Sequence, residues 1–211
     1  MTLVELSVGI VITTLVIGAL GALWYAVAET WRKSSSSQNV ALTGNQAAAR
    51  LEATLRQSKY ICQWKPGSVD GLTTPAASAF LWKGDDWNGS ADGKVQVGEL
   101  ALIEHDPAAQ RIYLYQAKPF ASMTLDQQIR AGTIFNWSTL SSASTPSDFK
   151  NLDYVQKTVL SEAVTGAAFN VPTATTGARP TLEFSLTISR SSGTTLVYSA
   201  ASLRTPSPRP L

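Results

Sequence analysis

Cysteine and histidine are almost absent from this sequence, which contains one of each, Cys62 and His105, among 211 residues. A single cysteine excludes a disulfide within the chain, so packing, hydrogen bonds or a bound metal must stabilise the fold. We expect Cys62 to be a small core residue at the end of a helix, and His105 to lie in a turn with Asp106 and Pro107. No nucleophile-elbow sequence is present either. These absences together predict that the protein is not an enzyme.

A large excess of either charge is also lacking. The 17 basic and 15 acidic side chains give a net charge of +2, and the basic residues form no cluster. Nucleic-acid-binding proteins ordinarily carry a basic stripe or patch, so the sequence does not indicate a nucleic-acid partner. The hydrophobic fraction of 44% is too high for a disordered chain, and the length is sufficient for one globular core with an appendage.

What the sequence does have is a long uncharged run at residues 6–28. As a helix this run spans about 35 Å at ~1.5 Å per residue, which exceeds the ~30 Å hydrocarbon layer of a bilayer. Trp24, Tyr25 and Trp31 stand where an aromatic belt would lie. A secretory signal peptide would begin with positive charge, and this segment does not. We interpret the run as a transmembrane helix, and a simple membrane anchor is the alternative to a more specific role.

Glu5 is the one acidic residue at the start of this apolar run. A charge at the centre of a membrane helix costs on the order of 2.5–3.5 kcal/mol, and less near the end, so such a residue usually has a function. If Met1 is the mature N-terminus, its amine on a neighbouring, axially displaced helix can neutralise Glu5 and set the step of assembly. The alternative is a lone acidic residue favoured by the positive end of the helix dipole.

Residues 1–20 read MTLVELSVGIVITTLVIGAL, which resembles the mature N-terminus of type IV pilins and type II secretion pseudopilins. In these families a leader peptidase cuts after a Gly and exposes a residue followed by TLVEL or TLIEL. The resemblance implies that Met1 follows the cleavage point and is N-methylated, and that Glu5 is the recruitment glutamate. Two positions depart from the pattern: Met1 itself, where Phe is commoner, and Ala22, where a helix-breaking Pro is usual.

The resemblance implies a structural subunit of a type IV pilus-like filament, in which copies of the chain bundle through their N-terminal helices. Its partners would be further copies of the chain, other pilins or pseudopilins, the inner-membrane assembly platform and the prepilin peptidase. The subunit would lie in the inner membrane before assembly and in an extracellular pilus afterwards. Two alternatives stay open: a subunit of the periplasmic pseudopilus of type II secretion, and a bitopic membrane-anchored binding domain.

The filament core is expected to be dry and helical, with partial melting near Gly18 and Gly21. Each glycine weakens a helix by about 1 kcal/mol relative to Ala. Thr13 and Thr14 can bond back to backbone carbonyls and bend the helix nearby. The family's usual Pro would add to this effect, and the sequence lacks it.

The expected fold class is α+β, a pilin fold in which a long N-terminal helix packs on an antiparallel β-sheet domain. Apolar residues at helical spacing predict one helix from about residue 2 to 59. Ser34–Ser37 and Gly44 are weak helix positions, so we expect a kink or break there. The predicted regions are a transmembrane and filament-core helix at 1–28, an amphipathic continuation at 29–60, a β-rich globular domain at 61–204 and a Pro-rich tail at 205–211.

Short runs of alternating or β-branched residues predict the strands of the globular domain. Residues 101–116 form one expected hairpin, and residues 190–193 form the turn of another. The order of elements after residue 159 is faintly similar to the C-terminal half of larger minor pilins and of the J-type pseudopilin. The expected strands are 80–82, 99–104, 111–115, 182–188 and 195–198, with a short helix at 125–131 and a Ser/Thr-rich loop at 138–147.

Asp86, Asn88, Ser90 and Asp92 place oxygen-bearing side chains at every second residue. In calcium loops, side chains at alternate positions converge on one cation in this way. The Gly and the closing bidentate Glu of such loops are missing at the corresponding positions. A calcium site and a solvated turn rich in Asp, Asn and Gly are therefore the two interpretations, and no other cofactor is predicted.

Overall fold

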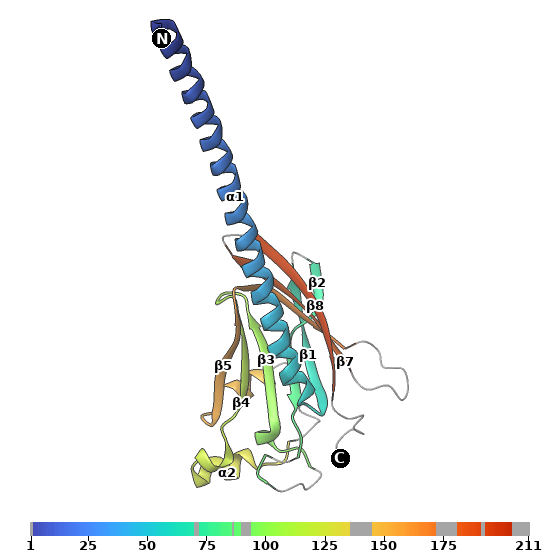
Figure 1. Cartoon of the computed structure of the whole chain (residues 1–211). Coiled ribbons are helices and arrows are strands. Elements are labelled where there is room, and N and C mark those ends of the chain that lie inside the picture. The colour runs from blue at the N-terminus through green and yellow to red at the C-terminus, as the bar shows by residue number, and fades with distance from the viewer. Residues whose placement is uncertain are drawn as a thin grey trace.

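The protein consists of one long helix and a β-rich domain packed on its C-terminal part (Figure 1). Helix α1 runs from Leu3 to Arg56 and is uninterrupted over its 54 residues. The expected kink or break at Ser34–Ser37 or Gly44 does not occur. The computed structural model describes residues 2–69, 72–85, 87–89, 94–135, 145–171, 181–190 and 193–203.

Gly44 has a packing role that its weak helix propensity did not suggest. It is buried, and a Cβ added there would lie 2.7 Å from Cγ2 of Val197 and 3.5 Å from Cδ1 of Ile188. Contact at 2.7 Å is shorter than van der Waals packing allows, so only glycine lets the helix approach the sheet this closely. The residue that looked like a helix breaker is therefore a point of close helix-to-sheet contact.

In the described part of the chain, eight strands form two antiparallel sheets. The first sheet has the order β1-β2-β3-β4-β5 and the second the order β6-β7-β8. The α+β class is confirmed, as are the 101–116 hairpin and the pairing of strands around residues 190–193. The strands are β1 (Tyr60–Val69), β2 (Leu72–Trp82), β3 (Leu100–Asp106), β4 (Arg111–Ala117), β5 (Val155–Glu162), β6 (Val164–Asn170), β7 (Thr181–Arg190) and β8 (Gly193–Ser202).

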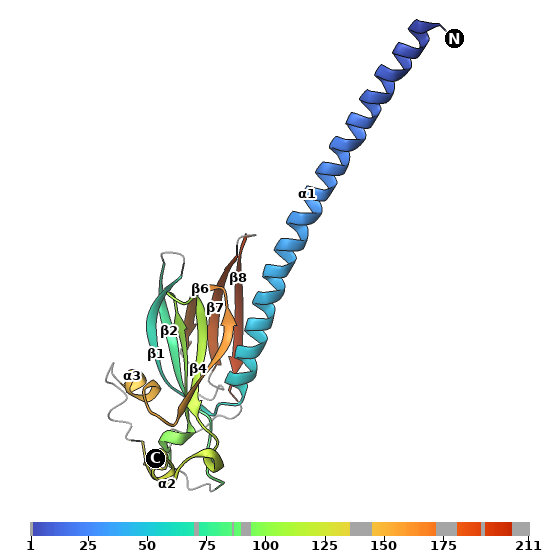
Figure 2. The same cartoon turned by 90° about the vertical axis from the view of Figure 1, so that its left-hand side faces the viewer.

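The main core lies between α1 and the two sheets. Val40, Ala47, Leu51 and Leu55 of α1 are buried in it, and this is the apolar face that the helical spacing predicts. From the sheets it receives the alternate residues Leu182, Phe184, Leu186 and Ile188 of β7, together with inward residues of β2, β3, β4 and β6. Figure 2 shows α1 running beside the edge of the domain nearest β8.

A second core covers the opposite face of the five-stranded sheet. Two 3-10 turns, η1 (Val97–Glu99) and η2 (Phe120–Ser122), and two short helices, α2 (Leu125–Ala131) and α3 (Thr145–Lys150), lie in the segments on that side. Helix α2 has the predicted bounds. The buried residues of this core are Phe80, Trp82, Val95, Leu100, Leu102, Tyr113, Tyr115 and Phe149.

His105 does not lie in a turn, so that prediction is wrong. It is a buried residue of β3, paired with Ile112 of β4, and the turn of the hairpin follows it at residues 107–110. Its Nε2 lies 2.9 Å from the carbonyl oxygen of Val164 on β6. Because β3 and β6 belong to different sheets, this hydrogen bond joins the sheets across the core, which a local sequence pattern cannot indicate.

Candidate functional site

The N-terminal part of α1 is an apolar surface that the β domain does not cover. We call residues 3–35 of α1 the arm and residues 40–56 the packed half. Leu15 and Trp24 of the arm are 68% and 71% exposed, whereas Val40 and Leu51 of the packed half are 1% and 0% exposed. The arm projects away from the β domain in both views (Figures 1 and 2).

The arm is long and apolar enough to cross a bilayer, and none of its apolar membrane-length stretch is buried by the rest of the chain. A helix that is apolar on all sides is stable only when lipid or other protein covers it. The arm must therefore have a covering environment that the monomer does not supply.

Glu5 lies in the first turn of the arm and forms a reciprocal cap with Thr2. The backbone N–H of Thr2 donates to Oε2 of Glu5 at 2.7 Å, and the backbone N–H of Glu5 donates to Oγ1 of Thr2 at 3.4 Å. This capping box satisfies two helix N–H groups that have no partner within the helix. Thr2 was not among the predicted residues, although the spacing Thr-x-x-Glu before an apolar run is a recognisable signal for such a cap.

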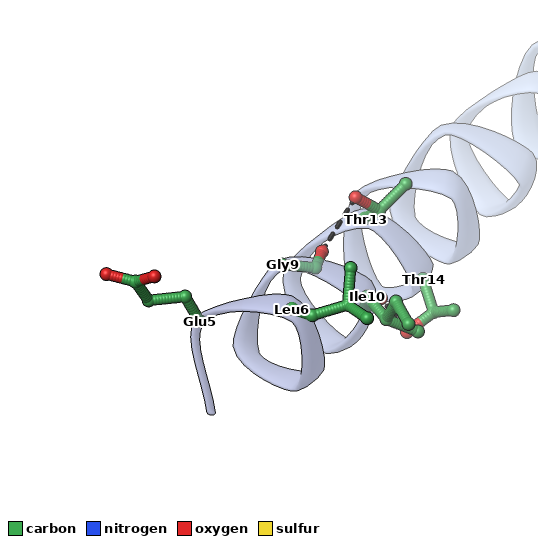
Figure 3. Close-up of a pocket in the computed structure, with 6 residues that line it drawn as sticks. All are labelled: Glu5, Leu6, Gly9, Ile10, Thr13 and Thr14. Carbon is green, nitrogen blue, oxygen red and sulfur yellow. Dashed lines mark hydrogen bonds between the residues drawn. The ribbon is translucent and has the colours of Figure 1, made fainter. Parts of the chain in front are cut away.

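A shallow groove runs along the helix surface beside Glu5 (Figure 3). Gly9 has no heavy atom within 4 Å of an added Cβ, so the backbone is open to a close neighbour there. The residues that line the groove are Glu5, Leu6, Gly9, Ile10, Thr13 and Thr14.

The hydroxyl groups of the groove are already satisfied within the helix. Oγ1 of Thr13 donates to the carbonyl oxygen of Gly9 at 2.8 Å, and Oγ1 of Thr14 contacts the carbonyl oxygens of Ile10 and Val11 at 3.1 and 2.9 Å. Internal bonding of this kind removes the cost of placing a threonine in an apolar environment. The carboxylate of Glu5 is therefore the strongly polar group that this groove presents.

The C-terminal end of the arm carries aromatic and charged residues. Trp24, Tyr25 and Trp31 are each more than 70% exposed. Glu29 forms an ion pair with Arg32 at 2.9 Å and lies 3.5 Å from the ammonium group of Lys33. Exposed aromatic rings next to paired charges match the composition of a membrane–water interface. If the arm crossed a bilayer, these residues would lie at its surface.

The structure bears only partly on the other predicted site residues. Met1 lies outside the described residues, so its approach to a neighbouring Glu5 stays a prediction. The helix is continuous through Gly18 and Gly21 in the isolated chain. The predicted melting concerns the assembled filament, and it also stays a prediction.

Three residues of the predicted calcium loop, Asp86, Ser90 and Asp92, lie outside the described residues. Asn88 is described, and its Nδ2 donates to Oε1 of Gln96 at 3.1 Å. Within the described ranges no group of three or more His, Cys, Asp or Glu side chains is arranged to hold a metal ion. The calcium site remains a prediction about the loop itself.

Glu99 is a buried carboxylate, and its position was predicted to be the first residue of a strand. It lies in the turn η1, where its Oε2 accepts hydrogen bonds from Nε1 of Trp82 and from the backbone N–H of Gln96, each at 3.0 Å. Hydrogen bonds to a carboxylate offset its desolvation, so the group can stay in the interior. Glu99 therefore fixes the segment that leads into β3.

Cys62 is partly buried against the second core, as predicted, but it lies on β1 and not at the end of a helix, because α1 already ends at Arg56. Burial raises the pKa of its thiol, because a thiolate loses hydration in apolar surroundings. The reactive form of a cysteine is the thiolate. Cys62 is accordingly a packing residue in this fold.

Comparisons of this chain with protein-family models, with curated proteins and with solved structures find no match. The arm, its capping box and its groove are therefore the features of the molecule that bear on its function.

Proposed function

We propose that this chain is a structural subunit of a type IV pilus-like filament that polymerises through its arm. The observation that carries the proposal is a carboxylate, Glu5, at the end of an apolar arm that the rest of the chain leaves uncovered. Lipid would cover the arm before assembly, and the arms of neighbouring copies would cover it afterwards.

The hydrophobic effect does not by itself favour the filament over the membrane. Lipid tails are as apolar as Leu or Val side chains, so the arm is covered equally well in both environments. The two environments differ in the partners that they offer to a charged group. An uncompensated charge is costly in both. Pairing Glu5 with the N-terminal amine of a neighbour lowers the free energy only in the assembled state, and it does so at one axial displacement.

The capping box is compatible with such a pairing. A carboxylate can accept about four hydrogen bonds on its two oxygens, and the contact with Thr2 uses one of them. Among the described residues no hydrogen bond to the second oxygen is formed, so this oxygen can accept from a neighbour while the cap with Thr2 stays in place. Gly9, one turn further on, allows the neighbouring helix to approach closely.

The packed half of α1 connects the arm rigidly to the β domain. Leu51 and Leu55 are fully buried, and Nη1 of Arg50 donates to the carbonyl oxygen of Leu160 on β5 at 3.2 Å. The side chain of Ser199 on β8 donates to the carboxylate of Glu52. A pilin fold uses the helix in this way, as core of the filament at one end and as core of the domain at the other. In the proposed filament the β domains form the outer surface.

The proposal is tested by expressing the chain with its assembly machinery and separating sheared filaments from membranes. Glu5→Lys and Glu5→Gln should leave the subunit in the membrane and abolish filaments, because the arm stays apolar while the pairing is lost. Glu29→Gln is the matched control, since Glu29 is an acidic residue of the same arm beyond the apolar run. It should assemble as the wild type does. Filaments at wild-type yield from Glu5→Lys would refute the proposed role of Glu5.

A further inference from the structure

Asn88 is followed directly by Gly89, whereas each of the other asparagines is followed by a residue that has a side chain. The side-chain amide of an asparagine can react with the backbone nitrogen of the next residue. A Cβ on that residue hinders the approach of the two groups, and glycine has none. Asn88 is therefore the asparagine whose sequence context most favours this reaction within the chain.

The backbone at this position is neither helix nor strand. Residues 87 and 88 lie in a turn and Gly89 in a bend. Gly89 is exposed, and among the described residues no neighbouring heavy atom lies within 4 Å of a Cβ added there. Its φ of +79° is a conformation that residues with a side chain rarely adopt, so the turn requires the glycine that makes Asn88 reactive.

Other asparagines lie where the backbone opposes the same reaction. Asn39 and Asn45 belong to α1, in which the N–H group of the next residue is bonded within the helix. Asn170 ends β6 and is followed by the β-branched residue Val171, which crowds the approach. These positions provide controls within the same chain.

The amide of Asn88 also connects the turn to the segment before β3. Its Nδ2 donates to Oε1 of Gln96 at 3.1 Å, and the backbone N–H of Gln96 donates to Oε2 of Glu99 at 3.0 Å. A hydrogen bond between partly buried side chains opens frequently compared with a slow covalent reaction. The contact with Gln96 therefore slows a reaction of Asn88 without preventing it.

We propose that Asn88 is a site of spontaneous deamidation, and that this modification releases the turn from Gln96. The backbone nitrogen of Gly89 loses its proton and attacks Cγ of Asn88. A new N–Cγ bond forms, the Cγ–Nδ2 bond breaks, and Nδ2 leaves with the proton as ammonia. Water then opens the resulting succinimide ring at either carbonyl and gives aspartate or isoaspartate. Water is the one reactant that the chain does not supply.

Deamidation replaces a hydrogen-bond donor by a negative charge. A carboxylate at position 88 has no N–H to donate to Gln96, and it repels the oxygen that accepted the bond. Isoaspartate also adds one carbon to the backbone next to Trp87. The ring of Trp87 lies so close to Gly98 that a Cβ there would be 2.6 Å from its Cε3. We therefore expect the modified turn to lose both the bond to Gln96 and this close fit.

The test is incubation of the full chain, folded in detergent at mildly alkaline pH, followed by peptide mapping with mass spectrometry. Asn88 should be converted to aspartate and isoaspartate about tenfold or more faster than Asn45 or Asn170, because glycine follows it and no helix or strand holds it. The rate should rise with pH, since the attacking nitrogen must lose its proton. Retention of the amide at Asn88, or conversion no faster than at Asn170, would overturn the proposal.

Two variants and one peptide separate the chemistry from the influence of the fold. Asn88→Gln keeps an amide but requires a six-membered ring, so modification at this position should disappear. Gln96→Ala removes the acceptor of the amide and should speed the conversion of Asn88 severalfold. A peptide of residues 85–90 gives the unrestrained rate. Conversion in this peptide with none in the folded chain would show that the fold protects Asn88, and it would overturn the proposal.

The structural consequence is measured on Asn88→Asp, which carries the product from the start. Its thermal midpoint should be lower than those of the wild type and of Asn88→Gln, and amides of residues 87–89 and 96–99 should exchange faster. If Asn88→Asp does not fold, aged wild type is compared with fresh wild type instead. An unchanged midpoint and unchanged exchange would overturn the proposed release of the turn. All of these measurements use the chain in detergent and are independent of filament formation.

Discussion

The arm and the packed half of α1 share one helical backbone but differ in what surrounds their apolar side chains. In the packed half the apolar residues lie on one face and are covered by the β domain. In the arm they occur on all faces and the domain covers none of them. Stability of the domain therefore depends on the packed half, whereas the arm contributes no packing to the domain. In the proposed function, lipid or neighbouring copies would cover the arm.

The largest expected effect tests this separation directly. Leu51→Ala should lower the free energy of unfolding of the β domain by about 2–5 kcal/mol, because it creates a cavity at a fully buried position. Leu15→Ala, the same change on the arm, should leave that free energy unchanged. Denaturant unfolding of both variants in detergent, followed by near-UV circular dichroism, measures the difference. Equal destabilisation by the two substitutions would mean that the arm contributes to the domain.

A second pair of variants compares glycines in the two halves. Gly44→Val should destabilise the domain by about 1–3 kcal/mol, since even a Cβ at this position collides with Val197. Gly21→Val should leave the domain unaffected, because nothing lies within 4 Å of a Cβ added there. Thermal melts of the two variants provide the measurement. A Gly44→Val protein with the wild-type melting temperature would contradict the close packing of α1 on β8.

A third experiment asks whether the arm keeps its helical geometry in the filament. We expect amides of residues 18–25 to exchange faster than flanking amides in filaments, because Gly18 and Gly21 weaken the helix. The double substitution Gly18→Ala and Gly21→Ala should remove the difference, and Gly9→Ala should not. Uniform protection across residues 10–25 would show that the assembled arm is an unbroken helix.

The smallest expected effect concerns the cluster formed by Asp126, Gln127, Arg130 and Asp153, in which Arg130 forms ion pairs with both carboxylates. Hydrogen bonds from Arg130 and Gln127 lower the pKa of the Asp153 carboxyl to about 2, from an ordinary value of 3.8. The folded state therefore favours the ionised form. The resulting stabilisation is fully present above pH 4 and is lost as the pH falls from about 4 toward 2.

The measurement is the melting temperature between pH 5 and pH 2, for the wild type and for Asp153→Asn. The wild type should lose more stability than the variant over this interval, by a small amount because the group is exposed and screened by solvent. Parallel curves for the two proteins would show that the cluster does not contribute.

Much of the arm and the outline of the domain could be predicted from sequence because their signals are local. An uncharged run, the Glu5 position and the alternation at residues 182–188 are each contained within one element. The capping residue Thr2 was equally local and was overlooked. A pattern within one element can be recognised from sequence because its periodicity depends on that element alone.

The features that sequence did not reveal depend on contacts between distant segments. Gly44 packs against Val197, and His105 bonds to Val164, so both contacts join residues far apart in the chain. Strand β1 was not predicted because its Lys-Pro-Gly run argues against a strand interior, although the edge position and the bulged pairing tolerate it. Strands β5 and β6 do not alternate cleanly between apolar and polar residues. The face that the rest of the protein covers changes along the length of each strand.

The unequal support along α1 has a mechanical consequence for any polymer built from it. A pulling force on the β domains passes into the packed half, where the core holds one face of the helix against the sheets. From there it reaches the arm, which only neighbouring molecules restrain. A residue that leaves the helix lengthens the chain by about 2 Å, from a rise of ~1.5 Å to ~3.5 Å when extended. The arm is therefore the part of each subunit that extends most readily, and a stretched polymer would lengthen there while its domains keep their shape.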